Sequence, residues 1–200
     1  MTKREALCAV PFVSGLGEDA LTVLESHMRL RTFRRGQPIF RQGDPGDSLF
    51  LVASGRIKLF IESSDGEHLT ILFCGPGSCF GEMAVLDGKT RSASAEALEP
   101  TKAWVVTRNA FLDLMRRDPG ISIEVISFLC SKLRTDLARM EEFIFLDTYN
   151  RVGRQLVRMA TKNASGDYVV LITQEELGRV VGNSREQVNR VLSDLSSIGH

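Results

Sequence analysis

The sequence lacks the short motifs that mark metal sites, membrane spans and common enzymes. None of its four cysteines stands in a Cys-x-x-Cys pair, so it offers no local thiolate set for a zinc ribbon or an iron–sulfur cluster. No stretch approaches the roughly 18 consecutive apolar residues that a membrane-spanning helix needs. P-loop, HExxH and GxSxG motifs are missing, and three scattered histidines suggest no catalytic triad. We therefore expect no enzyme, no membrane protein and no metal site.

The sequence also has no excess of charge of either sign. Its 25 basic and 25 acidic residues give a formal net charge of zero, which excludes binding to nucleic acid by bulk positive charge. Any contact with DNA must then come from a localised surface. The first residues lead into only a short apolar stretch that Pro11 interrupts, so we expect no secretory signal and a cytoplasmic location. In a reducing cytosol, Cys8, Cys74, Cys79 and Cys130 are expected to be small buried hydrophobes.

Residues 33–106 have the pattern of a β-rich domain. Short apolar runs alternate with glycine-containing turns, and Asp65-Gly66 between two such runs is typical of a hairpin. Many short strands at this spacing predict a sandwich or barrel with jelly-roll connections. A parallel α/β fold is disfavoured, because no helices of crossover length alternate with the strands.

Residues 121–147 predict one long helix, because they contain no glycine or proline. Apolar residues and one cysteine recur along it at alternating spacings of four and three, which is the pattern of a coiled-coil seam. The seam consists of Ile126, Cys130, Leu133, Leu137, Met140 and Ile144. We expect it to join two copies of the chain in a homodimer; the alternative is a long helix packed inside its own subunit. The helical pattern breaks after Phe145-Leu146-Asp147, which we expect to act as a hinge.

Residues 173–197 predict two short capped helices joined by a turn. Thr173 followed by Glu176 forms a capping box, Gly182 can end the first helix, and Ser184 can cap the second. Two such helices are typical of a helix-turn-helix. Four side chains point outward near the start of the second helix: Arg185, Glu186, Asn189 and Arg190. Arginine can bind the O6 and N7 atoms of guanine, and glutamate can accept from the N4 of cytosine. The alternative is a solvated face with a Glu186–Arg190 ion pair.

The segment Val181-Gly-Asn-Ser-Arg-Glu-Gln-Val-Asn-Arg-Val-Leu192 resembles the recognition helix of the cyclic-AMP receptor protein and FNR (CRP/FNR) family. The family's Arg-Glu-x-x-x-Arg motif falls on Arg185, Glu186 and Arg190. The resemblance implies reading of a TGTGA-like half-site, with the arginines on guanines and Glu186 on the opposing cytosine. It also implies double-stranded DNA and RNA polymerase as partners, and a β-hairpin wing that we expect to be missing from a sequence ending at His200.

Residues 10–147 resemble the family's cyclic-nucleotide-binding domain, and Phe80 to Ala93 resemble its phosphate-binding cassette. The expected effector-binding residues here are Gly81, Glu82, Met83, Ala84, Arg91 and Ser92. Gly81 to Ala84 can open a helical turn whose free N–H groups favour an anion. Arg91 can donate two parallel hydrogen bonds to a cyclic phosphate. Ser92 adds a hydroxyl, and Glu82 can accept from a ribose 2′-hydroxyl. Without ligand, Glu82 and Arg91 could instead pair with each other.

One departure from the family leaves the effector open. Cyclic-AMP-responsive members carry adjacent Thr and Ser on the long helix, which contact the base. The corresponding positions here hold Asp136 and Leu137, with Thr135 next to them. Thr135 and Asp136 are therefore the expected base-reading residues. We expect cyclic AMP first, with cyclic GMP, cyclic di-GMP, another small effector or no ligand as alternatives, and no covalent cofactor.

Together these features predict an α+β chain in three parts. Residues 1–120 form a jelly-roll sensor domain of the cyclic-nucleotide-binding type, residues 121–147 a dimerisation helix, and residues 148–200 a helix-turn-helix domain of the winged type. The expected function is that of a homodimeric transcription regulator switched by a small effector. The alternative is a cyclic-nucleotide-regulated signalling module that acts through protein contacts. The DNA contacts would come from Thr173, Ser184, Arg185, Glu186, Asn189 and Arg190.

Overall fold

The computed structural model describes residues 1–13 and 16–197, and the chain divides into two compact units. The first unit comprises Met1–Glu67 and Ile71–Lys132. The second comprises His68–Thr70 and the chain from Leu133 onward. Both belong to an α+β chain, as the sequence predicts. The predicted domain boundaries at residues 120 and 147 stay a prediction.

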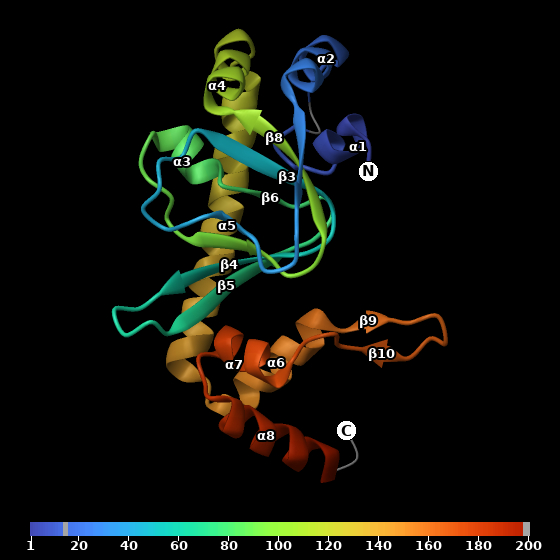
Figure 1. The fold of residues 1–200 in the computed structure, drawn as a ribbon, viewed down its shortest axis with the longest axis vertical. Helices are drawn as coiled ribbons and strands as arrows, with labels where there is room; N and C mark the ends of the chain where they lie inside the picture. The colour runs from blue at the N-terminus through green and yellow to red at the C-terminus, as the bar shows by residue number, and fades with distance from the viewer. Residues whose placement is uncertain (14–15, 198–200) are drawn as a thin grey trace. The chain divides into compact units, whose positions relative to one another are not determined.

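Eight short strands form two four-stranded sheets in the first part of the chain (Figure 1). The strands are β1 (Arg29–Phe33), β2 (Pro38–Phe40), β3 (Ser48–Ser54), β4 (Ile57–Glu62), β5 (His68–Cys74), β6 (Cys79–Phe80), β7 (Ser94–Ala97) and β8 (Thr101–Thr107). One sheet has the order β1-β8-β3-β6 and the other has the order β2-β7-β4-β5. The pairs β1–β8, β3–β8, β3–β6, β2–β7 and β4–β7 are antiparallel. This order, in which most neighbouring strands are not consecutive in sequence, agrees with the expected jelly roll.

Strand β3 shows why these residues form a sandwich. Side chains alternate between the two faces of a strand, so Phe50 and Val52 enter the core between the sheets while Leu49 and Leu51 face the other way. The core between the sheets draws buried residues from both of them: Phe33, Phe50, Val52, Ile57, Cys74, Phe80, Ala95, Ala97 and Ala103. The rings of Phe50 and Phe80 stack with their centroids 5.0 Å apart.

Helices cover the opposite face of β3 and β8. These are α1 (Lys3–Cys8), α2 (Glu18–His27), α3 (Glu82–Asp87), α4 (Arg108–Arg117) and the start of α5 (Gly120–Phe145). Their apolar side chains form a second core with Leu49, Leu51 and Val106 of the sheet. Burial of this apolar surface fixes α3 and α5 against the sheet, and both of these helices contribute to the pocket described below.

Helix α5 is 26 residues long and spans about 39 Å at 1.5 Å per residue. The helix starts one residue before the predicted range of 121–147 and ends two residues before the end of that range. The next helix, α6 (Thr148–Met159), starts there because the Asp147 side chain accepts a hydrogen bond from the Asn150 backbone N–H at 2.8 Å. The break therefore falls inside the predicted hinge segment, and bending at that segment stays a prediction.

The second unit contains α6, a hairpin of β9 (Thr161–Lys162) and β10 (Tyr168–Val169), and helices α7 (Gln174–Val181) and α8 (Arg185–Ser197). Its buried core joins the three helices through Val152, Leu177, Val181, Val188 and Val191. The wing that we expect to be missing would follow α8, where the chain lies outside the described residues, so that expectation stays a prediction.

The cysteines divide into two kinds. Cys74 is buried, and burial raises the pKa of its thiol to about 12, so it is an inert hydrophobe as expected. Burial also raises the pKa of the half-buried Cys79 thiol well above its usual value. Cys8 and Cys130 are exposed, so the expectation of burial is wrong for these two. Cys130 is exposed because it lies on the uncovered face of α5.

Candidate functional site

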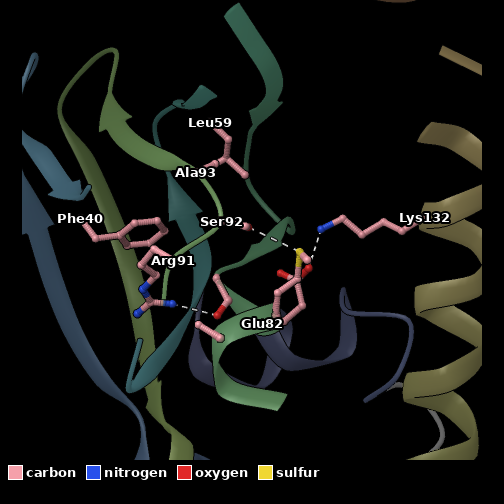
Figure 2. Close-up of a pocket in the computed structure, with 10 residues that line it drawn as sticks. Phe40, Leu59, Glu82, Arg91, Ser92, Ala93 and Lys132 are labelled. Carbon is pink, nitrogen blue, oxygen red and sulfur yellow. Dashed lines mark hydrogen bonds and ion pairs between the residues drawn. The ribbon is translucent and has the colours of Figure 1, made fainter. Parts of the chain in front are cut away.

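A pocket opens in the first unit, between the cassette segment and α5 (Figure 2). It brings together all six effector-binding residues expected in the cassette. We call it the sensor pocket. It is lined by Phe40, Leu59, Gly81, Glu82, Met83, Ala84, Arg91, Ser92, Ala93 and Lys132.

Arg91 lies at the wall of the sensor pocket and is only 4% exposed. Its Nη1 donates to the carbonyl oxygen of Gly81 at 2.9 Å, and its Nη2 donates to Ser48 Oγ at 3.4 Å. Its guanidinium carbon lies 4.2 Å from the centre of the Phe40 ring. Figure 2 shows the two side chains next to each other. The buried Nε has no hydrogen-bond partner within the described residues. A buried cation with an unused donor favours an anion in the adjoining pocket.

The backbone around Arg91 leaves it little room. Gly81 adopts a positive φ of 79°, and a side chain there would meet Arg91 Nη1 at 2.7 Å. At Gly46 a Cβ would collide with Ala84 and lie 3.3 Å from Arg91 Nε. Glycine is required at both positions by this close approach. Burial lowers the pKa of Arg91 from its usual value, although the charges of Asp47 and Asp44 oppose this.

Glu82 pairs with Lys132 rather than with Arg91. Lys132 Nζ donates to Glu82 Oε1 at 2.5 Å, and the carboxylate is buried. The Glu82–Arg91 pair that the sequence left open is therefore wrong, because the Gly81 carbonyl, Ser48 and Phe40 occupy the guanidinium. Burial alone would lower the pKa of Lys132, but the charge of Glu82 and its hydrogen bond outweigh this and raise it.

Lys132 is a pocket residue that was not predicted from the sequence. A signal was available, because Lys132 precedes Thr135 and Asp136 by three and four residues and so shares their side of the helix. Thr135 and Asp136 are exposed residues further along α5, in the second unit. Their contact with a base stays a prediction.

Ser92 and Met83 both line the pocket, and both are exposed. Ser92 Oγ donates to Met83 Sδ at 3.5 Å. This bond is weak because a thioether is a poor acceptor, so the hydroxyl is available to a better one. The charged lining residues are Glu82, Arg91 and Lys132, which together carry one net positive charge.

One face of α5 exposes apolar side chains along its whole length. The expected seam residues are exposed, with values of 59% for Ile126, 60% for Leu133, 56% for Leu137, 57% for Met140 and 69% for Ile144. Ile123, which the sequence analysis missed, lies three residues earlier, is also exposed, and extends the same pattern. Continuous apolar patches of this kind are typical of protein interfaces.

Helices α7 and α8 form the expected helix-turn-helix. Thr173 and Glu176 make the predicted capping box of α7, and Gly182 ends that helix with a positive φ of 69°. Ser184 Oγ accepts from the Gln187 backbone N–H at 3.3 Å at the start of α8. Gly178 permits the tight turn, because a Cβ there would lie 2.6 Å from the Asn183 carbonyl oxygen.

The four expected DNA-reading side chains of α8 are all exposed. Arg185 and Arg190 make no hydrogen bond or ion pair within the part of the chain that the structure describes. The alternative Glu186–Arg190 pair is therefore not formed. Hydrogen bonds from its own backbone N–H and from Ser184 hold the pKa of Glu186 below its usual value, so it is an acceptor at neutral pH. Asn189 Oδ1 accepts from Gln174 Nε2 at 3.2 Å, and Gln174 is a neighbour that the sequence analysis missed.

The described residues hold no cluster of histidine, cysteine and acidic side chains suited to a metal ion. Among the same residues, no helix combines the length and apolarity needed to cross a bilayer.

Comparison with known proteins matches both parts of the chain. Residues 30–118 match the cyclic nucleotide-binding domain family, and residues 150–200 match the Crp-like helix-turn-helix domain family. The Cyclic AMP receptor protein of Thermus thermophilus is 35% identical over 189 residues, which cover 94% of this chain and 87% of that protein. The CRP-like cAMP-activated global transcriptional regulator of Mycobacterium tuberculosis is 30% identical over 200 residues, covering 98% and 89%.

A solved structure supports the fold. The c-di-GMP responsive global regulator CLP of Xanthomonas campestris superposes with a TM-score of 0.79 at 23% identity, covering 92% of this chain and 93% of that one. The matched domains, the sensor pocket and the capped helix pair lead to one family. This chain belongs to the CRP/FNR family of transcription regulators, with a cyclic-nucleotide-binding domain followed by a Crp-like helix-turn-helix DNA-binding domain.

Proposed function

We propose that this protein is a homodimeric transcription regulator whose binding to a TGTGA-like palindrome is switched by a cyclic mononucleotide. The observation that carries the proposal is Arg91, a buried cation that lines an open pocket. RNA polymerase is the proposed protein partner, and the cytoplasm the proposed location, as expected for a bacterial regulator of this family.

The charge of the sensor pocket favours a mononucleotide. Its one net positive charge matches the single negative charge of a cyclic phosphodiester, whereas a cyclic dinucleotide carries two. In the proposed complex the phosphate binds Arg91 and Ser92, and the Ser92 hydroxyl turns away from Met83. Glu82 accepts from the ribose 2′-hydroxyl while it keeps its ion pair with Lys132.

Recognition of the nucleotide's base is supported only by the family resemblance. We assign its recognition to Thr135 and Asp136, through the resemblance given above. Cyclic AMP is the first choice, because the relatives from Thermus and Mycobacterium are named for it. Cyclic GMP and cyclic di-GMP are the other ligands to be tested.

The proposed homodimer forms through the seam of α5. Exposed apolar residues at heptad spacing over most of a 26-residue helix are costly in water, and a second copy of the same helix buries them. Two copies would also present two α8 helices, as a palindrome requires.

The DNA contacts are assigned to the exposed start of α8. Arg185 and Arg190 have guanidinium groups that are unpaired within the described residues and available to guanines, and Glu186 is an acceptor for a cytosine amino group. Asn189 completes the face. Thr173 and Ser184 stand at the helix N-termini, where hydroxyl and backbone N–H groups commonly bind phosphates.

Fluorescence anisotropy with a labelled duplex tests this proposal. The duplex carries two TGTGA half-sites, the control duplex carries the same bases in scrambled order, and each is titrated with and without each cyclic nucleotide. We expect one nucleotide to strengthen binding to the palindrome. Replacing Arg185 or Arg190 by alanine should cost about 1–3 kcal/mol on the palindrome only. Arg116→Ala, which removes an exposed arginine of α4, is the control.

Equal binding to the palindrome and the scrambled duplex would contradict the DNA-reading assignment. Nucleotide binding without any duplex binding would instead favour a signalling module that acts through protein contacts.

A further inference from the structure

Arg151 of α6 connects the last turn of α5 with the turn of the helix-turn-helix, and all the residues involved belong to the second unit. Its Nη1 donates to the carbonyl oxygen of Phe143 at 3.1 Å. Its Nη2 donates to Asn183 Oδ1 at 2.8 Å. The guanidinium carbon also lies 5.3 Å from the centre of the Phe143 ring. One rigid fork therefore binds two segments that are 40 residues apart in the sequence.

Asn183 links Arg151 to the recognition helix α8 by hydrogen bonds. Its Nδ2 donates to Thr148 Oγ1 and to Gln187 Oε1, both at 3.0 Å. The same Gln187 oxygen accepts from the backbone N–H of Ser184 at 3.0 Å. Because Ser184 caps α8, the Asn183 side chain orients the first turn of the helix that carries Arg185 and Glu186.

An apolar contact runs beside these hydrogen bonds. A Cβ placed on Gly182 would lie 2.8 Å from Cε1 of Phe143, so the ring presses directly on the turn. Gly182 also has the positive φ that favours glycine. The end of α5 thus touches the turn through both a ring and a carbonyl oxygen, the latter by way of Arg151.

The arrangement is specific to an arginine. The Nε of Arg151 is buried and has no partner within the described residues, so the contacts of this side chain are made through its two terminal nitrogens. The planar guanidinium reaches the Phe143 carbonyl and Asn183 together, which the point charge of a lysine does less well.

We propose that Arg151 is a positioning residue that transmits displacements of the end of α5 to the first turn of α8. The proposal rests on the proposed function, in which an effector at the first unit changes DNA binding by the second. Movement of the Phe143 carbonyl carries Arg151 with it, Arg151 carries Asn183, and Asn183 moves the cap of the DNA-reading helix.

The variants are chosen to separate positioning from general stability. Arg151→Ala and Asn183→Ala each remove the bond between these two residues, and the double variant completes a cycle. Arg151→Lys keeps the charge and serves as the second variant if Arg151→Ala does not fold. Arg154→Ala is the matched control, because Arg154 also joins α6 to α5 through Glu142 but, among the described residues, makes no hydrogen bond or ion pair with the turn.

Duplex binding with and without the activating nucleotide is the first measurement. We expect Arg151→Ala and Asn183→Ala to reduce the ratio of the two affinities by about tenfold, with no further loss in the double variant. Arg151→Lys should retain part of the ratio, and Arg154→Ala should leave it unchanged. A ratio in Arg151→Ala equal to that in Arg154→Ala would overturn the proposal.

Hydrogen exchange of the amides of residues 183–188 is the second measurement, and it needs neither nucleotide nor DNA. Faster exchange at these amides in Arg151→Ala than in Arg154→Ala supports positioning, and equal exchange overturns it. If the parent protein binds no duplex with any nucleotide, the proposed function fails, and the exchange measurement still decides the role of Arg151.

Discussion

A single arginine shows how local geometry creates affinity for an anion. Arg91 is oriented by the Gly81 carbonyl, Ser48 and the Phe40 ring, yet its Nε has no partner within the described residues. These neighbours fix the plane of the guanidinium before a ligand arrives. Little side-chain entropy then remains to be lost on binding.

Replacing Arg91 by alanine should abolish cyclic-nucleotide binding and leave the fold intact, because the side chain satisfies no buried carboxylate. Arg91→Lys should bind weakly, since an ammonium cannot offer the same fork. Isothermal calorimetry measures the binding, and the melting temperature reports the fold. Lys102→Ala, at an exposed lysine of β8, serves as control. Undiminished binding by Arg91→Ala would show that the phosphate is held elsewhere.

At the scale of one element, α5 carries more apolar side chains than a helix packed on one side only would have. Its first turns bury Ile121 and Val125 in the first unit, while the seam residues stay exposed over the rest of its length. A helix with two apolar faces needs two partners. The first partner is its own unit, and the second is the proposed copy of the chain.

Leu133→Asp should convert the proposed dimer to monomers, because two carboxylates would meet at the centre of the seam. Ala138→Asp is the matched control, since it places the same charge on an exposed position of α5 outside the seam. Sedimentation velocity measures the oligomeric state. A Leu133→Asp variant that sediments as the parent does would contradict the assigned interface.

The corner between α5 and α6 should depend on pH. Glu142 accepts from Arg158 at 2.5 and 2.7 Å and from Arg154 at 3.0 Å, and these hydrogen bonds hold its pKa below its usual value despite partial burial. A carboxyl with a lowered folded-state pKa stabilises the fold above the unfolded pKa of about 4.3, and this contribution is lost as pH falls toward the folded value.

Glu142→Gln should therefore lower the free energy of unfolding at pH 7 by about 1 kcal/mol or less, since both arginines are largely exposed. Thermal unfolding of the variant and the parent between pH 7 and pH 3 measures the difference. The two curves should converge at low pH, where the parent carboxyl is protonated. A difference that is the same at every pH would rule out the ion pairs as its cause.

At the scale of the whole molecule, the net charge is zero, but positive charge is concentrated at two places, the sensor pocket and the start of α8. The sensor pocket carries one net positive charge, and the start of α8 presents two free arginines beside one glutamate. The two groups lie in different compact units that share one continuous helix. Coupling between them must follow thermodynamic reciprocity.

If the activating nucleotide strengthens duplex binding by some factor, the duplex should strengthen nucleotide binding by the same factor. Calorimetric titration of nucleotide into the protein, with and without saturating palindrome, measures this factor independently of the anisotropy experiment. Unequal factors would indicate more than one nucleotide site or a change in oligomeric state.

Several site residues were predictable because their signals are local. Thr173 and Glu176 form a capping box over four residues, Gly182 and Ser184 delimit the turn, and the cassette from Phe80 to Ala93 is a continuous segment. The heptad spacing of the seam is visible along one helix. Such features depend on backbone geometry within a few residues, so sequence reasoning finds them.

Other residues were not predictable because their partners are distant in the sequence. Lys132 meets Glu82 across 50 residues, and Arg151 meets Asn183 across 32. Gln174 reaches Asn189 from the preceding helix. Helical spacing places Lys132 on the same side of the helix as Thr135 and Asp136, but it does not identify Glu82 as the partner of Lys132. A Glu82–Arg91 pair was as reasonable from charge alone, and nothing near Arg151 marks its contacts.

The sequence by itself determined that residues 33–106 are rich in strands, where the long helix and the helix-turn-helix lie, and which short motifs could hold a phosphate or face a base. Hydrophobic periodicity, helix caps and glycine turns are encoded by residues close together in the sequence, so they can be recognised without knowledge of the tertiary structure. Only the tertiary structure decided which cation neutralises Glu82, that Arg91 is left with an unpaired buried donor, and that Arg151 bridges α5 to the recognition helix. Those outcomes depend on packing between distant segments, where burial and competing hydrogen bonds choose among partners of equal formal charge.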